Sequence, residues 1–312
     1  MKKVFLLGII SFSLLNSSAQ SKKAYAITSD VKGSYNWVTV KEIDLSTGEV
    51  IKTVFDPNAT SDVTVKGPDG QTLARYDWTA APTYSGVAAA AFDEKNQRLY
   101  FTNMRGNELR YFDLSNNQLS VVELPDAEFN TGAKAVEANV ITRMVIAADG
   151  NGYALTNDGN NLIRFSTEGK TVITKVGALL DHSKNAGISI HNQCTSWGGD
   201  MIADSYGNLY VFTMRGHVFK INIASRVADH IGTISGLPAN FTVNGTAVDE
   251  NGDVLLSSAT LTDNYYRINL GTLKALPMDK KVEEVWNASD LASSNIAYRN
   301  SLGQTATTTV VK

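Results

Sequence analysis

Cysteine is nearly absent from this chain of 312 residues, because Cys194 is the only one. No intramolecular disulfide can form, so the fold must be stabilised by the burial of apolar side chains. A lone thiol is more often a small buried apolar residue than a nucleophile. We therefore expect Cys194 to be buried.

Charge is also scarce, since Asp, Glu, Lys and Arg make up 19% of the residues and the formal net charge is −3. The chain has neither a cluster of Lys and Arg nor an excess of positive charge, which argues against nucleic acid as a partner and against an anionic membrane surface. Four histidines are present, and they lack the spacing of metal-binding motifs: His182, His191, His217 and His230.

Long apolar runs are missing after the first twenty residues, so the sequence predicts no transmembrane segment. The first twenty residues carry two lysines, then VFLLGIISFSLL, then the small residues of NSSAQ. This is the pattern of a secretory signal peptide that is cleaved near Ala19 or Gln20, and it is typical of bacteria. We expect residues 1–20 to be a signal peptide and residues 21–312 to form a single domain. The mature protein would be exported to the periplasm, the cell surface or the medium.

What the sequence has in abundance is short alternating strands separated by turns. Each of five strands ends in an apolar residue followed by a small polar one: Ile43-Asp44, Phe112-Asp113, Phe165-Ser166, Ile221-Asn222 and Ile268-Asn269. Four of these strands are preceded by a small-residue strand that ends in Asp: Asp93, Asp149, Asp204 and Asp249. Residues that favour tight turns follow each landmark. Each unit therefore reads as four short antiparallel strands.

The period of this repeat is roughly 45 to 56 residues between the Asp landmarks, which is the size of a β-propeller blade. A solenoid is the alternative repeat architecture, but its repeats are usually shorter and have fewer strands. The sequence predicts an all-β propeller of five or six four-stranded blades. The count stays open because residues 56–86 contain a hairpin around Pro68-Asp69-Gly70 that could decorate the first blade or belong to a sixth.

The first unit lacks an inner strand of small residues. A matching segment, NASDLASSNIAY, occurs near the other end of the chain, with Ala292 at the position of the repeated Ala and Ser294 at that of the Asp. We expect this segment to be the inner strand of the N-terminal blade. Such closure would remove the free sheet edges that invite aggregation.

The stretches ADSYGNLYVF, AADGNGYALTN and KEIDLSTGEV resemble the repeats of NHL-repeat, YVTN and gluconolactonase-like propellers. The likeness spans most of residues 24–300. It implies the propeller fold and leaves the function open, because one fold serves many functions.

Ligands of propellers usually gather at one end of the central channel, on the segments that lead into the inner strands. The richest of these segments here is SIHNQCTSWGGD, which contains His191, Asn192, Trp197 and Asp200. With Arg143 from a second segment, these residues predict a site for a sugar or another small polar ligand. The alternative is a structural loop whose Trp closes the mouth of the channel.

Asp200, Asn244 and Asp290 are predicted to lie near the inner rim, where their oxygens could bind Ca²⁺. Gluconolactonase-like propellers hold a divalent metal with Glu, Asn and Asp, so the resemblance implies a metal-dependent lactonase as one alternative. The chain departs from that family because it has no Glu followed by a Gly-Pro-aromatic entry near residue 21.

Two matched arginines, Arg105 in TNMRG and Arg215 in TMRG, could bind a carboxylate or could be solvated hairpin tips. On balance the sequence favours a binding or scaffold protein for a protein, glycan or small-molecule ligand at one rim. It favours this over an enzyme, for which a lactonase-like hydrolase is the alternative. The oligomeric state stays open, with a monomer as the simplest expectation.

Overall fold

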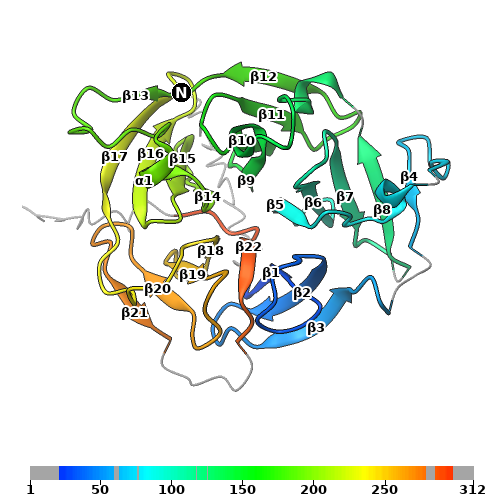
Figure 1. Ribbon diagram of the computed structural model, residues 1–312, viewed down its shortest axis with the longest axis horizontal. Coiled ribbons are helices and arrows are strands. Elements are labelled where there is room, and N and C mark those ends of the chain that lie inside the picture. The colour runs from blue at the N-terminus through cyan, green and yellow to red at the C-terminus, as the bar shows by residue number, and fades with distance from the viewer. Residues whose placement is uncertain are drawn as a thin grey trace, which may run out of the picture.

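The computed structural model describes residues 21–59, 63–75, 77–116, 118–124, 126–278 and 285–297. Five β-sheets stand around a central axis, each with one strand near the centre and its other strands further out (Figure 1). The protein is therefore a β-propeller, as the repeat predicts, and of the five or six blades expected it has five. The predicted signal peptide, residues 1–20, and the C-terminal residues 298–312 lie outside the described residues.

Blade one takes its strands from both ends of the chain, and blade two follows it in the sequence. Blade one consists of β22 (Ala288–Ala292), β1 (Lys23–Thr28), β2 (Thr39–Asp44) and β3 (Val50–Phe55). Blade two consists of β5 (Val87–Asp93), β6 (Arg98–Asn103), β7 (Leu109–Asp113) and β8 (Ser120–Leu124), with the short β4 (Val65–Lys66) parallel to β8. The predicted hairpin around Pro68-Asp69-Gly70 follows β4. It therefore decorates blade two, not blade one or a sixth blade.

The other three blades follow in chain order. Blade three consists of β9 (Ile141–Ile146), β10 (Asn151–Thr156), β11 (Leu162–Ser166) and β12 (Ile173–Gly177). Blade four consists of β14 (Asp200–Ala203), β15 (Asn208–Phe212), β16 (His217–Asn222) and β17 (Val227–Thr233), with β13 (Leu180–Asp181) parallel to β17. Blade five consists of β18 (Gly245–Val248), β19 (Val254–Ser257), β20 (Tyr266–Ile268) and β21 (Ala275–Pro277).

Helices are few and short in the described part of the chain. They are α1 (Gln193–Ser196) and the 3-10 turns η1 (Trp78–Ala80), η2 (Ala127–Phe129) and η3 (Glu137–Asn139). None of them has the length needed to cross a lipid bilayer.

The ring closes as the sequence predicts, because β22 from the end of the chain pairs with β1 from its beginning. Tyr25 lies opposite Ala292 and Ala26 opposite Leu291 in this antiparallel pair. The side-chain amide of Asn295 adds two hydrogen bonds of 2.7 Å to the backbone of Ser21. Both ends of the described chain are thus held in one sheet.

The repeated polar landmarks cap the turns within the blades. The carboxylate of Asp149 accepts a hydrogen bond from the Asn151 amide at 3.0 Å, and that of Asp249 accepts one from the Asn251 amide at 2.8 Å. A side chain that bonds the backbone two residues ahead fixes a tight turn locally. These turns recur because each blade needs the same reversal at the same place.

The core is divided into five apolar clusters, and each cluster lies between two neighbouring blades. Around the axis the inner strands approach so closely that side chains must be small. A Cβ at Gly245 of β18 would lie 2.7 Å from backbone atoms of Asp290 and Leu291 in β22. Ala89, Ala90 and Ala91 of β5 are likewise buried. This crowding explains the small residues of the first strand in each repeat.

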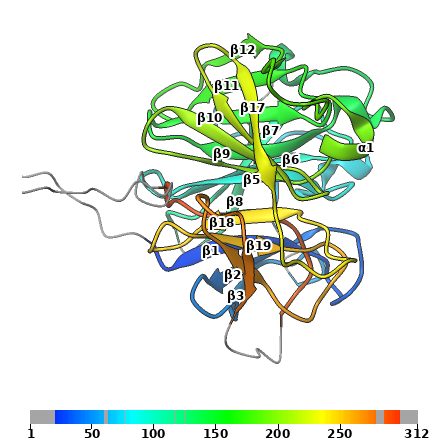
Figure 2. The same ribbon diagram turned by 90° about the vertical axis from the view of Figure 1, so that its left-hand side faces the viewer.

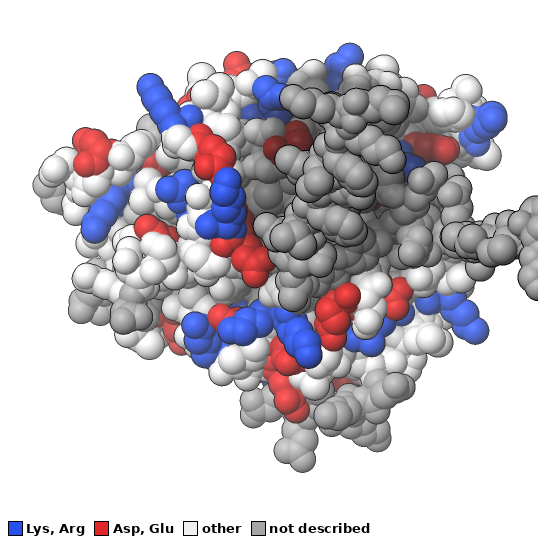
Figure 3. Space-filling model, turned by 180° about the vertical axis from the view of Figure 1, so that it is seen from behind, with Lys and Arg blue, Asp and Glu red and all other residues white. Residues whose placement is uncertain are grey.

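The two faces of the ring differ in what they carry. The segments that lead into the inner strands, α1 among them, lie on the face shown in Figure 1, which we call the mouth face. In the side view of Figure 2, α1 projects from this face. On the opposite face, Lys and Arg are interspersed with Asp and Glu (Figure 3).

Candidate functional site

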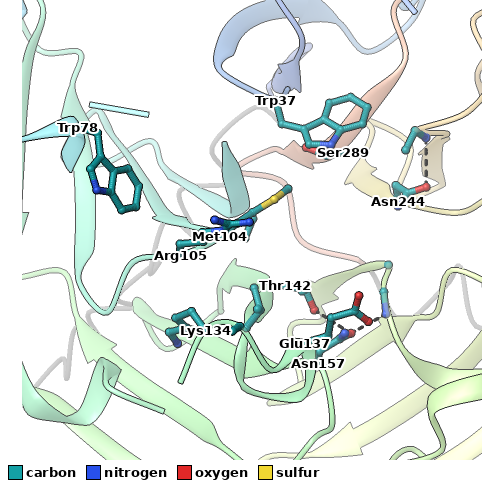
Figure 4. A pocket seen from close by; sticks show the side chains of 16 residues that line it. Trp37, Trp78, Met104, Arg105, Lys134, Glu137, Thr142, Asn157, Asn244 and Ser289 are labelled. Atoms are coloured by element: carbon teal, nitrogen blue, oxygen red, sulfur yellow. Dashed lines mark hydrogen bonds between the residues drawn. The ribbon is translucent and has the colours of Figure 1, made fainter. Parts of the chain in front are cut away.

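A cavity of about 700 Å³ opens on the mouth face and is lined by residues from all five blades. Its apolar wall includes Trp37, Trp78 and Met104. Its polar lining includes Arg105, Lys134, Glu137, Asn157, Asn244 and Ser289. Figure 4 shows these side chains around the opening, with Met104 and Arg105 between the two tryptophans. We call this space the mouth cavity.

Trp37 and Trp78 are placed by loops of blades one and two. Trp37 follows β1, is 7% exposed, and its carbonyl accepts a hydrogen bond from the Val87 amide at the start of β5. Trp78 begins η1, whose N-terminus is capped by the Asp77 carboxylate, and the residue is 60% exposed. An exposed indole at the edge of a cavity offers a flat face for a ligand.

The two asparagines of the cavity wall are oriented by backbone amides. The Oδ1 atom of Asn157 accepts from the Gly198 amide at 2.6 Å, and that of Asn244 accepts from the Ala259 amide at 3.1 Å (Figure 4). Because the oxygen of each side chain is held, the opposite end of the amide group presents its N–H donors. Neither side-chain nitrogen has a hydrogen-bond partner among the described residues.

Two cations reach the cavity from blades two and three. The Lys134 ammonium donates to the Thr131 hydroxyl at 2.6 Å and to the Asn139 carbonyl at 2.9 Å, and burial lowers its pKa to about 8. The Arg105 guanidinium has no hydrogen bond or ion pair within the described chain. Its five N–H donors are therefore open to solvent or to a ligand.

Beyond the cavity the inner strands carry two buried carboxyl groups, Asp200 and Asp290. Asp200 accepts from the Met201 amide at 2.6 Å and from the Thr246 amide at 2.6 Å. It thereby satisfies a backbone donor on the inner edge of the next blade. Burial nevertheless raises the pKa of Asp200 to about 8.

Asp290 occupies the matching position in blade one but is less well satisfied. Both of its carboxylate oxygens are buried without a hydrogen-bond partner at normal distance, although the Ala90 amide faces them. Burial, together with the charge of Asp200, raises the pKa of Asp290 well above its usual range.

Arg143 is fully buried and acts as a clamp between blades three and four. Its guanidinium donates to the carbonyls of Thr156 and Asn157 at 3.3 Å, of Ser196 at 2.6 Å and of Gly198 at 2.7 Å. Burial lowers its pKa to about 10, so the group stays charged at neutral pH. Arg143 holds the segment that leads into β14 and does not line the mouth cavity.

The segment predicted to be richest in ligand contacts mostly supports the cavity from behind. The imidazole of His191 lies between the carbonyls of Asp158, at 2.7 Å, and Leu179, at 3.2 Å. Asn192 caps α1, and the Trp197 indole donates to the His191 carbonyl at 3.2 Å. None of the three lines the mouth cavity, so their direct contact with a ligand stays a prediction.

Cys194 is exposed, which corrects the expectation that it is buried. It lies in the single turn of α1, where Ser196 is the buried residue. A one-turn helix on the surface turns only one side toward the protein interior. In α1 that side carries Ser196, whose hydroxyl donates to the Ser189 carbonyl at 2.6 Å, so Cys194 is left exposed.

The three residues predicted to bind Ca²⁺ lie at two depths. Asn244 lines the mouth cavity, whereas Asp200 and Asp290 are fully buried. Ca²⁺ takes six to eight oxygen ligands, but the oxygens of Asn244 and Asp200 already accept backbone N–H groups. In the described part of the chain, no three His, Cys, Asp or Glu side chains are grouped as metal ligands. The role of these three residues as Ca²⁺ ligands therefore stays a prediction.

Several cavity residues were not identified from the sequence, among them Trp37, Trp78, Lys134 and Ser289. Asn157 could have been identified, because TNMRG and TNDG place Arg105 and Asn157 on the same turn of successive blades. The matched Arg215 of blade four is exposed but lies outside the cavity. Only one of the two arginines is therefore placed to meet a ligand there.

Comparison with known proteins yields the fold and no family. No protein-family model and no curated protein matches the sequence. A solved protein of unknown function from Bacteroides thetaiotaomicron VPI-5482 is similar at a TM-score of 0.50 and 12% identity, over 88% of this chain and 71% of that one.

Two further solved structures are more distant. One is virginiamycin B lyase from Staphylococcus aureus, at a TM-score of 0.38 and 12% identity over 84% of this chain and 71% of that chain. The other is the extracellular domain of a one-component system from B. thetaiotaomicron, at 0.40 and 13%. The match covers 78% of this chain but only 28% of that domain. Of the three, the protein with a TM-score of 0.50 supports a likeness of fold alone, because its identity is 12%.

Proposed function

We propose that this propeller is a binding protein that holds a polar ligand in the mouth cavity. The observation that carries the proposal is the composition of the cavity wall, in which two indoles and several oriented donors come from different blades. Blades packed through buried clusters keep such groups at fixed distances, and a recognition surface needs this rigidity. A ligand bound there would touch every blade.

The N-terminal segment supports a place of action outside the cytoplasm. Its two lysines, apolar stretch and small residues form the pattern of a secretory signal, and binding proteins for external solutes act after export. The mass of the mature protein tests this, because cleavage near Ala19 or Gln20 would leave a chain that starts at Gln20 or Ser21.

A metal-dependent hydrolase is the second candidate, and the one observation in its favour is the pair of unpartnered oxygens of buried Asp290. Elemental analysis of the purified protein tests it. Stoichiometric metal that a chelator removes together with a hydrolytic activity would support the hydrolase. If the purified protein contains no metal and added Ca²⁺ leaves its melting temperature unchanged, the metal-dependent hydrolase is eliminated.

Ligand screening by tryptophan fluorescence and thermal shift tests the binding function. For a ligand found in such a screen, Trp78→Ala should weaken binding by about tenfold, since a stacked aromatic contributes about 1–1.5 kcal/mol. The matched control is Tyr206→Ala, which also removes an aromatic ring. Tyr206 is 52% exposed and lies in the turn after β14, at the end of that strand away from the mouth cavity. Equal affinity of both variants and the wild type would place the ligand elsewhere on the molecule.

A further inference from the structure

Hydrogen-bond donors dominate the wall of the mouth cavity. The side-chain N–H groups of Asn157 and Asn244 face a ligand because the oxygens of both amides are held by the backbone. Ser289 also lines the cavity, although its hydroxyl oxygen is buried and has no partner in the described chain. The two amide groups come from blades three and five. A ligand that satisfies them must present oxygen acceptors in several directions.

Charge in the same wall favours an anion. Arg105 and Lys134 face a single lining carboxylate, that of Glu137. The guanidinium of Arg105 has its full set of donors available, and its planar shape matches a carboxylate. Arg105 is exposed at the edge of the cavity, so its guanidinium is free to meet a carboxylate that arrives with the ligand.

The buried acids beyond the cavity do not oppose an anion at neutral pH. The pKa of Asp200 is raised to about 8 by burial. The pKa of Asp290 is raised by burial and by the charge of Asp200. Burial therefore favours the neutral form of both acids. In their neutral form, Asp200 and Asp290 do not offset the positive charge of Arg105 and Lys134.

The tryptophans select among oxygen-rich anions. Trp78 is exposed and offers an aromatic face against which the apolar face of a sugar ring can pack while its hydroxyls form hydrogen bonds at the sides, and the largely buried Trp37 adds apolar wall. An inorganic anion would leave the exposed indole of Trp78 without a contact. A ring that bears hydroxyls and a carboxylate uses all three kinds of group.

We propose that the mouth cavity binds a carboxylate-bearing saccharide, such as a uronic acid residue at the end of a glycan. Its carboxylate lies against Arg105 and Lys134, and its hydroxyl oxygens accept from Asn157 and Asn244. This inference rests on the proposed binding function and adds the chemical class of the ligand.

Isothermal titration with a panel of uronate trisaccharides, built from glucuronate, galacturonate or mannuronate, tests the proposal. Each trisaccharide is paired with its methyl ester, which removes the charge and keeps the hydroxyls. At least one acid form should bind, and its ester should bind about tenfold or more weakly. Arg105→Gln should lower affinity for the acid by a similar factor and remove the difference between acid and ester.

The matched control is Arg215→Gln, which changes an equivalent arginine outside the cavity and should leave affinity within about twofold. Thermal melts of both variants check that they fold. Equal binding of acid and ester would overturn the anionic ligand and leave the binding function standing. A cavity that binds only peptides with a free C-terminal carboxylate, or no uronate at millimolar concentration, would overturn the saccharide.

Discussion

Asp200 and Asp290 each lie four residues before the landmark position of their repeat, yet they differ in how the fold satisfies them. Asp200 accepts two backbone amides at 2.6 Å, one of them from the neighbouring β18. Asp290 has no comparable donor for either oxygen. A buried carboxylate without partners is costly in its charged form, so Asp290 binds a proton more tightly in the folded state than in the unfolded one.

This difference predicts how stability depends on pH. Because the folded-state pKa of Asp290 is raised, its contribution is fully present below the unfolded pKa near 3.8 and is lost as pH rises toward the folded value. Asp290→Asn removes that titration and keeps the shape. Relative to the variant, the wild type should lose up to about 1.4 kcal/mol of unfolding free energy per pH unit as the pH rises above 3.8 toward the folded-state pKa. Urea denaturation across this range measures the gap, and a constant gap would show that Asp290 is partnered in solution.

Individual side-chain roles were the least predictable part of the sequence. Arg143 was identified as a residue of the site, but it clamps four carbonyls because the folded chain brings Ser196 and Gly198 next to it. The neighbouring residues in the sequence do not distinguish an arginine that is buried against carbonyls from one that is available to bind a ligand. Arg105 is the opposite example. Its place on a turn could be predicted from the repeat, but only the structure shows that its guanidinium has no hydrogen bond or ion pair within the described chain.

At the scale of the element, strands and turns were readable from the sequence because their causes are local. Alternation of apolar and polar residues, small inner strands and Asp-capped turns each depend on a few consecutive residues. The loops that form the cavity depend on contacts between blades instead. The carbonyl of Trp37 bonds to Val87, and a Cβ at Gly86 would lie 2.7 Å from the carbonyl oxygen of Asn36. No repeat in the sequence encodes such contacts, so Trp37 and Trp78 could not be placed in advance.

The pairing of β22 with β1 is the element on which the ring depends, and a covalent link across it tests this. Ala26 and Leu291 lie opposite each other, so Ala26→Cys with Leu291→Cys, in a Cys194→Ser background, should form a disulfide. Joining the two ends restricts the unfolded chain and should stabilise the fold by up to about 4 kcal/mol. The oxidised protein should therefore melt several degrees higher than the reduced protein. Failure to form the bond in the folded state would contradict the register of this pair.

At the scale of the whole molecule, the ring brings titratable residues from different blades, Lys134 and Asp200 among them, into or near the mouth cavity. Lys134, with a pKa lowered to about 8 by burial, loses positive charge between pH 7 and 9. Asp200, with a pKa raised to about 8 by burial, gains negative charge in the same range. The negative charge of Glu108 acts on Lys134, and the positive charge of Arg143 acts on Asp200. Arg143 stays charged in this pH range because its pKa is lowered only to about 10.

Both titrations make the mouth less positive as pH rises, so affinity for an anionic ligand should fall by about three- to tenfold from pH 7 to pH 9. The methyl ester of the same ligand is the control, and its affinity should change little. Titration calorimetry at several pH values gives both curves. Parallel curves for acid and ester would show that Lys134 and Asp200 do not act on the ligand.

The most direct test of the central claim is a crystal structure of the protein soaked with a mixture of neutral and acidic oligosaccharides. The account predicts an ordered sugar in the mouth cavity, within hydrogen-bond distance of the side-chain amides of Asn157 and Asn244 and packed against Trp37 or Trp78. A sugar bound only on an outer strand or on the opposite face, with the cavity holding water alone, would contradict it.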